Sequence, residues 1–173
     1  KKQVNSVNKM KRIIYVDKKY HDRFIEESKM QGKIAQFLRQ TQKFEVSIYL
    51  TLDSMITNVI KSLRITGNPY DALLTHVPQN LEDVKRGYPD YKSASHEDFF
   101  SKLYQRSLEV IREIKTQNPD MPIIAYTGAD NIPTVKSLFL QSGIDEVIFK
   151  SGSKKLEEDA RMIQQALEKH LAV

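Results

Sequence analysis

The 173-residue sequence has no cysteine, no glycine-rich loop and no long apolar run. Without cysteine the chain has no disulfide, no thiolate nucleophile and no cysteine-ligated metal, which is compatible with a reducing compartment. The apolar runs Ile13–Val16 and Val147–Phe149 are far shorter than the roughly 20 residues that a membrane-spanning helix requires. We therefore expect a soluble, cytoplasmic protein that does not associate with membranes.

The excess of basic residues is modest. The 27 lysines and arginines stand against 22 acids, which gives a net charge of +5, and the basic residues are spread along the chain instead of forming one stripe. Binding of nucleic acid is therefore unsupported. A metal site is not expected either, because neither His21 nor His96 forms a pair with Asp17 or Asp98 at a spacing typical of metal ligands.

Short apolar segments alternate with segments of helical periodicity. The predicted strands are rich in Ile, Val, Tyr and Phe and cover 12–16, 44–50, 70–75, 121–127 and 146–150. Apolar residues at helical spacing follow each strand and predict helices that include 24–38, 52–63, 99–114, 135–139 and 156–167. This alternation indicates an α/β domain with one doubly wound parallel sheet and helices on both faces.

The length suits a single domain. We assign 11–173 to that domain and 1–10 to an N-terminal linker or appended segment, because the chain begins without methionine and has the character of a piece of a longer protein. The polar stretch at about 78–95 is too long for an ordinary strand-to-helix connection. Long loops of this kind are often functional.

Polar residues stand at the predicted carboxyl ends of four strands. They are Asp17, His76, Thr127 and Lys150. In a doubly wound sheet, ligands and chemistry gather beyond these ends, near the point where the strand order reverses. An acid, a hydroxyl and a lysine around one point are typical of phosphoryl chemistry, in which cations and hydrogen-bond donors neutralise charge on phosphate oxygens. We therefore expect the functional site at this rim.

Three segments around these positions resemble the receiver domain of two-component response regulators. Tyr70–Pro78 is similar to the third strand of that family, Met121–Ala129 to the fourth strand with its signalling threonine, and Ser142–Lys150 to the glycine turn and the fifth strand with its lysine. The threonine and the lysine match the family. The resemblance covers about residues 11–170 and implies a flavodoxin-like five-stranded parallel sheet in the order 2-1-3-4-5.

Four residues depart from the family pattern, and all four departures affect one mechanism. His76 occupies the position of the phosphoacceptor aspartate, and Lys18 that of the second of two adjacent acids that hold magnesium. Val147 stands where the family has its switch aromatic, and Ser151 where it has a proline. Magnesium needs oxygen ligands, usually carboxylates, so the resemblance implies weak magnesium binding or none. The degenerate rim comprises Asp17, Lys18, His76, Thr127 and Lys150.

The resemblance implies a regulatory, protein-interaction module of a signal-transduction protein that works without phosphorylation, is not an enzyme and needs no cofactor. Its partner would be another signalling protein or a domain of its own parent chain. Receivers transmit signals through the face of their fourth helix, fifth strand and fifth helix, which would also allow a homodimer. The apolar residues that we assign to this face are Phe139, Leu140, Val147 and Phe149.

The sequence leaves alternatives open. In a phosphorelay on an altered acceptor, His76 or Thr75 would take the phosphoryl group and Lys150 would neutralise it. As a generic flavodoxin-like scaffold, the domain would bind a nucleotide or a flavin at the same rim, although the phosphate-binding glycines are missing. The rim residues also have structural interpretations: Lys150 pairs with Asp17, Thr127 satisfies buried backbone, and His76 is hydrogen-bonded in place.

Overall fold

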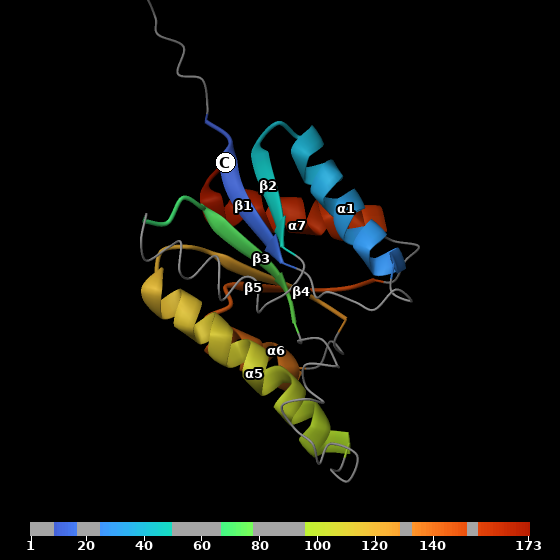
Figure 1. Ribbon diagram of the computed structural model, residues 1–173, viewed down its shortest axis with the longest axis vertical. Coiled ribbons are helices and arrows are strands. Elements are labelled where there is room, and N and C mark those ends of the chain that lie inside the picture. Colours follow the sequence, from blue (N-terminus) through green and yellow to red (C-terminus); the bar gives the residue numbers. More distant parts are fainter. Residues whose placement is uncertain (1–8, 17–24, 50–66, 78–95, 129–132, 152–155) are drawn as a thin grey trace, which may run out of the picture.

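The computed structural model describes residues 9–16, 25–49, 67–77, 96–128, 133–151 and 156–173. Within these ranges the chain forms one sheet with helices on both sides (Figure 1). The predicted helix at 52–63, the stretch at 78–95 and the rim residues Asp17 and Lys18 lie outside the described residues, as does most of the segment 1–10.

Five parallel strands make up the sheet, in the order β2-β1-β3-β4-β5. They are β1 (Lys11–Val16), β2 (Phe44–Tyr49), β3 (Ala72–His76), β4 (Ile123–Thr127) and β5 (Glu146–Phe149). The predicted flavodoxin-like fold and strand order are therefore confirmed. The strand positions also agree with the prediction. They could be predicted because a parallel strand that is buried on both faces appears in the sequence as a continuous apolar run.

Four helices are described: α1 (Ile25–Gln40), α5 (His96–Gln117), α6 (Pro133–Gln141) and α7 (Leu156–Leu171). Helices α1 and α7 cover one face of the sheet, and α5 and α6 cover the other (Figure 1). Helix α5 ends at Gln117, and the backbone and side-chain amides of the next residue, Asn118, both donate to the carbonyl of Ile114, at 2.9 and 3.2 Å. Helix α6 begins with a proline, which lacks the N–H that a first turn would leave unsatisfied.

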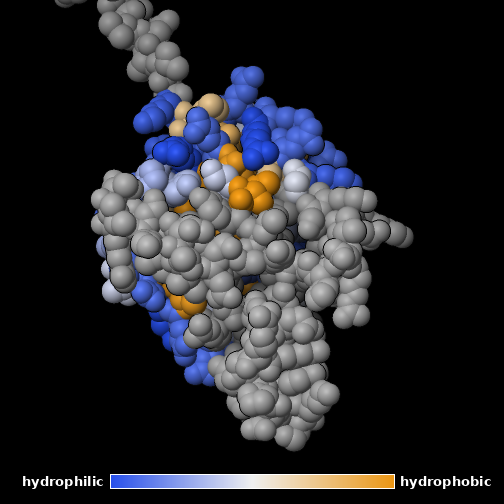
Figure 2. Space-filling model, in the orientation of Figure 1, coloured by the Kyte–Doolittle hydropathy of each residue, from blue (hydrophilic) through white to orange (hydrophobic). Residues whose placement is uncertain are grey.

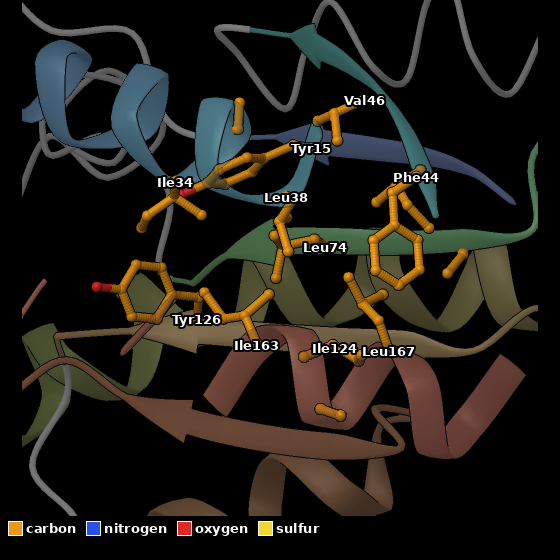
Figure 3. Close-up of a cluster of buried hydrophobic side chains, with 14 of the residues drawn as sticks. Tyr15, Ile34, Leu38, Phe44, Val46, Leu74, Ile124, Tyr126, Ile163 and Leu167 are labelled. Atoms are coloured by element: carbon orange, nitrogen blue, oxygen red, sulfur yellow. The ribbon is translucent and has the colours of Figure 1, made fainter. Parts of the chain in front are cut away.

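Alternate residues of each strand build two cores, one on each face of the sheet. Ile14 and Leu73 belong to the core under α5 and α6, whereas Leu74 belongs to the core under α1 and α7. Two buried tyrosines, Tyr15 and Tyr126, lie in the second core (Figure 3). Because all the strands are parallel, their carboxyl ends meet at one edge of the sheet, which is where the described rim residues His76, Thr127 and Lys150 stand.

The described residues on the face shown in Figure 2 are mainly hydrophilic, with a few small apolar areas between them. None of the described helices combines the length and the hydropathy that crossing a membrane would need.

Candidate functional site at the carboxyl edge of the sheet

Three of the predicted rim residues are described, and the strand register brings them to one edge. His76 ends β3 and pairs with Tyr126 of β4. Thr127 ends β4 and pairs with Phe149 of β5. The amide of Lys150 extends this ladder, because it donates to the carbonyl oxygen of Thr127 at 2.7 Å. The residues therefore stand at the ends of three adjacent strands.

The end of β3 is buried. His76, at the position of the family's phosphoacceptor, is 6% exposed, and Thr75 is fully buried. The hydroxyl of Thr75 donates to the carbonyl oxygen of His76 at 3.1 Å. Side chains this deeply buried give a phosphodonor little access.

Thr127 uses its hydroxyl inside the fold. The side chain is fully buried and its Oγ1 donates to the carbonyl oxygen of Val77, one residue beyond the end of β3. A buried carbonyl without a partner is costly, so this bond joins β4 to the chain that leaves β3 and satisfies a backbone group. The contact agrees with the structural interpretation of Thr127.

Lys150 lies against the end of β4. Its ammonium nitrogen is 5.1 Å from the ring centroid of Tyr126, which is a cation–π distance. Its Cδ lies 3.9 Å from where a Cβ at Gly128 would be, so the aliphatic part of the side chain passes close to this glycine. The lysine is half-buried. Its predicted partner Asp17 lies outside the described residues.

Sequence reasoning missed a buried acid beside this lysine. Asp159, in the first turn of α7, is fully buried, and its Oδ2 accepts hydrogen bonds from the hydroxyl of Tyr126 at 2.7 Å and from the amide of Ser151 at 3.0 Å. A proline at position 151, as in the receiver family, would have no N–H to donate. The only sequence signal was an acidic first turn, Glu157 to Asp159, which is equally typical of an exposed helix start.

The described part of the rim has few of the oxygen ligands that magnesium needs. His76, Thr127 and Lys150 contribute an imidazole, a hydroxyl and an ammonium group, and the carboxylate of Asp159 is already engaged by two donors. Within the described ranges, no three His, Cys, Asp or Glu residues are grouped so that they could hold a metal ion. These groups mostly donate hydrogen bonds, which suits contact with an acceptor better than contact with a cation.

The assignment of Phe139 to the partner face is wrong. Phe139 is fully buried and packs edge-on against Tyr104 of α5, with 5.5 Å between the ring centroids. Its spacing of four residues from Val135 turns both side chains toward the same core, because residues i and i+4 share one face of a helix.

The other residues assigned to that face differ in exposure. Leu140 is 43% exposed, whereas Val147 and Phe149 are half-buried and Val147 also packs against the core under α5 and α6. An apolar residue that the sequence analysis did not select, Met162 on α7, is 45% exposed. The apolar surface on this side of the molecule therefore includes α7 as well as α6 and β5.

The sheet order and the helices on both faces define the fold as that of response-regulator receiver domains. A response regulator from Thermotoga maritima aligns with a TM-score of 0.58 and 13% identity, over 95% of this chain and 99% of that one. A CheY-like receiver domain protein from Methanospirillum hungatei aligns with a TM-score of 0.56 and 15% identity, over 94% and 97%. An orphan response regulator of H. pylori aligns with a TM-score of 0.56 and 13% identity, over 93% and 96%.

No protein-family model and no curated protein sequence matches the chain. The solved structures share its fold at low sequence identity, so the likeness establishes the fold, and the function has to be argued from the site.

Proposed function

We propose that the chain is a receiver-like regulatory module that acts through protein contacts and does not depend on phosphorylation of an aspartate. The observation that carries this proposal is the buried imidazole of His76 at the carboxyl end of β3, where a receiver would have its acceptor carboxylate. Imidazole does not form the acyl phosphate that an aspartate forms.

Electrostatics at the rim supports the same proposal. A receiver gathers a divalent cation with carboxylates, and here Lys18 and His76 stand at two of the positions that would supply them. The ammonium group of Lys150 lies at the same edge and adds positive charge. The buried carboxylate of Asp159 already accepts hydrogen bonds from Tyr126 and Ser151. Magnesium binding at this rim would therefore be weak or absent.

The alternative functions fit the described rim less well. Phosphorylation of Thr75 or His76 would require access to side chains that are fully buried and 6% exposed, respectively. A nucleotide or flavin site would need a loop whose backbone amides surround a phosphate, and the segment after β4 has only Gly128 as a glycine before α6.

Intact-mass measurement after incubation with magnesium and acetyl phosphate tests the proposal. We expect no gain in mass, whereas a phosphoryl group would add about 80 Da together with about two negative charges. A gain that maps to the rim would overturn the proposal. The variant His76→Ala then identifies the acceptor, because it removes the label only if the histidine carries it.

A parallel thermal-shift panel of nucleotides and flavins should leave the melting temperature unchanged, since a ligand that binds only the folded state raises it.

We also propose that the partner is another signalling protein or another domain of the parent chain, that it binds at the face formed by α6, β5 and α7, and that the module is cytoplasmic and has no catalytic activity of its own. The exposed Leu140 and Met162 supply apolar contacts on this face.

A further inference from the structure

Of the two outer strands of the sheet, β2 is the longer. It has six residues, whereas β5 has four. Figure 1 shows β2 at one end of the sheet, beside α1. An outer strand presents a row of backbone groups to which a strand of another chain can bond, and proteins protect such edges by shortening, charging or covering them. Because β2 is not short, another feature has to protect its edge.

The register of β2 on β1 identifies the backbone groups that form this row. The amide of Lys11 donates to the carbonyl oxygen of Lys43, which therefore faces β1. The backbone groups of successive residues in a strand point to opposite sides, so every second residue from Lys43 also faces β1. The amides and carbonyls that point away from the sheet belong to the residues between them, which are Phe44, Val46 and Ile48.

The charged residue of β2 does not protect this row. Glu45 is an ion-pair partner of Arg12 on β1, at 3.7 Å, so its carboxylate is held toward the neighbouring strand. The three residues whose backbone points outward are all apolar, and Ile48 is only half-buried. Charge therefore gives the outer edge of β2 little protection against a further strand.

Arg39 covers the middle of the row. Its Nη2 donates to the carbonyl oxygen of Val46 at 2.6 Å, and hydrogen bonds from a charged donor are stronger than those between neutral groups. The arginine is exposed and lies in the last turn of α1. Favourable interaction with the helix dipole accounts for a basic residue at that place, but it does not account for the contact with β2.

The end of α1 does not need this side chain for its own carbonyls. The amide and the hydroxyl of Thr41 both donate to the carbonyl oxygen of Leu38, at 3.3 and 2.7 Å. The amide of Gln42 donates to the carbonyl oxygen of Arg39 at 3.1 Å. The turn that follows the helix therefore caps it, and the guanidinium group of Arg39 contacts the strand instead.

We infer that the outer edge of β2 is a site for strand addition by β2 of a second copy of this chain, and that Arg39 keeps this site closed. A twofold axis at Val46 sets the two strands antiparallel, with Val46 opposite Val46 and Phe44 opposite Ile48. Both hydrogen bonds of the central pair end on a carbonyl of Val46, which is the group that Arg39 contacts.

A second copy of β2 is the occupant that this edge fits. In the twofold arrangement Glu45 lies opposite Ser47, so no like charges face each other across the strands. An interface on a twofold axis is complementary to itself, and β2 supplies the same alternation of outward amides and carbonyls to each copy. The inference goes beyond the proposed function, because β2 lies at the opposite end of the sheet from β5.

Removal of the arginine tests the inference by sedimentation velocity. Arg39→Ala should self-associate at least about tenfold more tightly than the wild type, because losing one charge-assisted hydrogen bond changes an equilibrium constant by about that factor or more. Arg161→Ala is the matched control. It removes the same charge from an exposed ion pair with Glu157 on α7 and should associate like the wild type.

A proline on the same edge provides a rescue variant. Arg39→Ala with Ile48→Pro should return to the association of the wild type, because proline has no N–H to donate to a partner strand. The N–H that it replaces points away from β1, so no bond within the sheet is lost, and proline is tolerated at such positions of edge strands. Circular dichroism should show all variants folded.

Hydrogen exchange locates the contact and decides alone if the proline variant does not fold. In Arg39→Ala, the amides of Phe44, Val46 and Ile48 should gain protection as the protein concentration rises, and in the wild type they should not. Three results would overturn the inference: Arg39→Ala that associates no more tightly than the wild type, association that leaves these amides unprotected, or association that a folded Ile48→Pro double variant retains. None of them bears on the proposed function, which the phosphodonor experiment tests separately.

Discussion

The backbone amide of Ser151 donates a hydrogen bond of 3.0 Å to Oδ2 of Asp159. The same oxygen accepts from the hydroxyl of Tyr126 at 2.7 Å. One buried carboxylate therefore joins the end of β5, a side chain of β4 and the first turn of α7. In a receiver with proline after the lysine, the first of these bonds could not form, so this tie between β5 and α7 depends on a departure from the family pattern.

We predict that this carboxylate is a large contributor to stability. Asp159→Ala leaves the buried hydroxyl of Tyr126 and the part-buried amide of Ser151 without their acceptor, and Tyr126→Phe leaves the carboxylate with one donor fewer. Each should therefore lower the free energy of unfolding in urea by about 1–3 kcal/mol. Glu157→Ala, two positions away on the exposed side of the same turn, should change it by less than about 0.5 kcal/mol. Equal effects at positions 157 and 159 would show that the buried network is not what stabilises the start of α7.

Gly143 provides a second stability test, because two separate effects oppose a side chain there. Its φ is +99°, and a Cβ would lie 2.9 Å from Cγ of Lys115, whereas Gly67 has a φ of +74° and nothing within 4 Å of its Cβ position. Gly67→Ala should therefore cost only the backbone strain, about 1–2 kcal/mol. Gly143→Ala should cost clearly more, because Lys115 would have to move.

Lys115 cannot move freely, since its ammonium group donates to the carbonyl oxygen of Met121 at 3.1 Å and to the carboxylate of Asp145 at 2.8 Å. Urea unfolding of both alanine variants provides the comparison. If Gly143→Ala and Gly67→Ala lose the same free energy, the close approach of Lys115 does not contribute.

The sequence predicts the parts of this structure that depend on a local pattern of residues, and it does not predict the parts that depend on contacts between separate elements. The apolar runs of β1 and β4 identify strands by themselves, and the match of Thr127 and Lys150 to receivers indicates the strand order. The hydrogen bonds of Asp159 could not be predicted, because they depend on how α7 packs against β4, whose Tyr126 is 33 residues away in the chain, and on the position of the Ser151 amide that precedes the helix.

The sequence pattern also could not predict which face of α6 is buried. The helix has only nine residues, and four of them are apolar: Val135, Leu138, Phe139 and Leu140. Several faces of so short a helix therefore look apolar, and only packing against Tyr104 decides that Phe139 is buried while Leu140 is 43% exposed.

A third prediction concerns acid stability. The hydrogen bond from Lys43, at 2.8 Å, and a second one from Gln164 hold the pKa of the Glu168 carboxyl below its ordinary value of 4.5. A carboxyl whose pKa is lowered in the folded state stabilises the fold above its unfolded pKa, and this stabilisation is lost as the pH falls through the folded pKa. Lys43→Gln should thus cost about 0.2–1 kcal/mol at neutral pH, the range for partly exposed ion pairs, and almost nothing in strong acid.

Urea unfolding of Lys43→Gln and of the wild type across the acid range checks this prediction. Arg161→Gln is the matched control, because it removes an exposed ion pair with Glu157 in which both side chains are more than half exposed. A loss in Lys43→Gln that persists unchanged in strong acid would mean that Lys43 acts through packing and not through the carboxylate.

The last prediction follows from the charge at the rim. If missing carboxylates are what prevents magnesium binding, then Lys18→Asp together with His76→Asp should bind magnesium at least about tenfold more tightly than the wild type, because both positions then carry the oxygen ligands that the ion requires. Isothermal titration calorimetry measures the affinity directly. Each single substitution should give a smaller gain, since one added carboxylate only partly offsets the positive charge of the rim.

The control is Lys19→Asp with His76→Asp, which changes the net charge by the same amount but puts the first carboxylate one residue farther along the chain. If this control binds magnesium as tightly as the first double variant, net charge alone governs affinity and the positional correspondence with receivers at residue 18 is wrong. If neither double variant binds magnesium, the buried end of β3 excludes the ion for steric reasons.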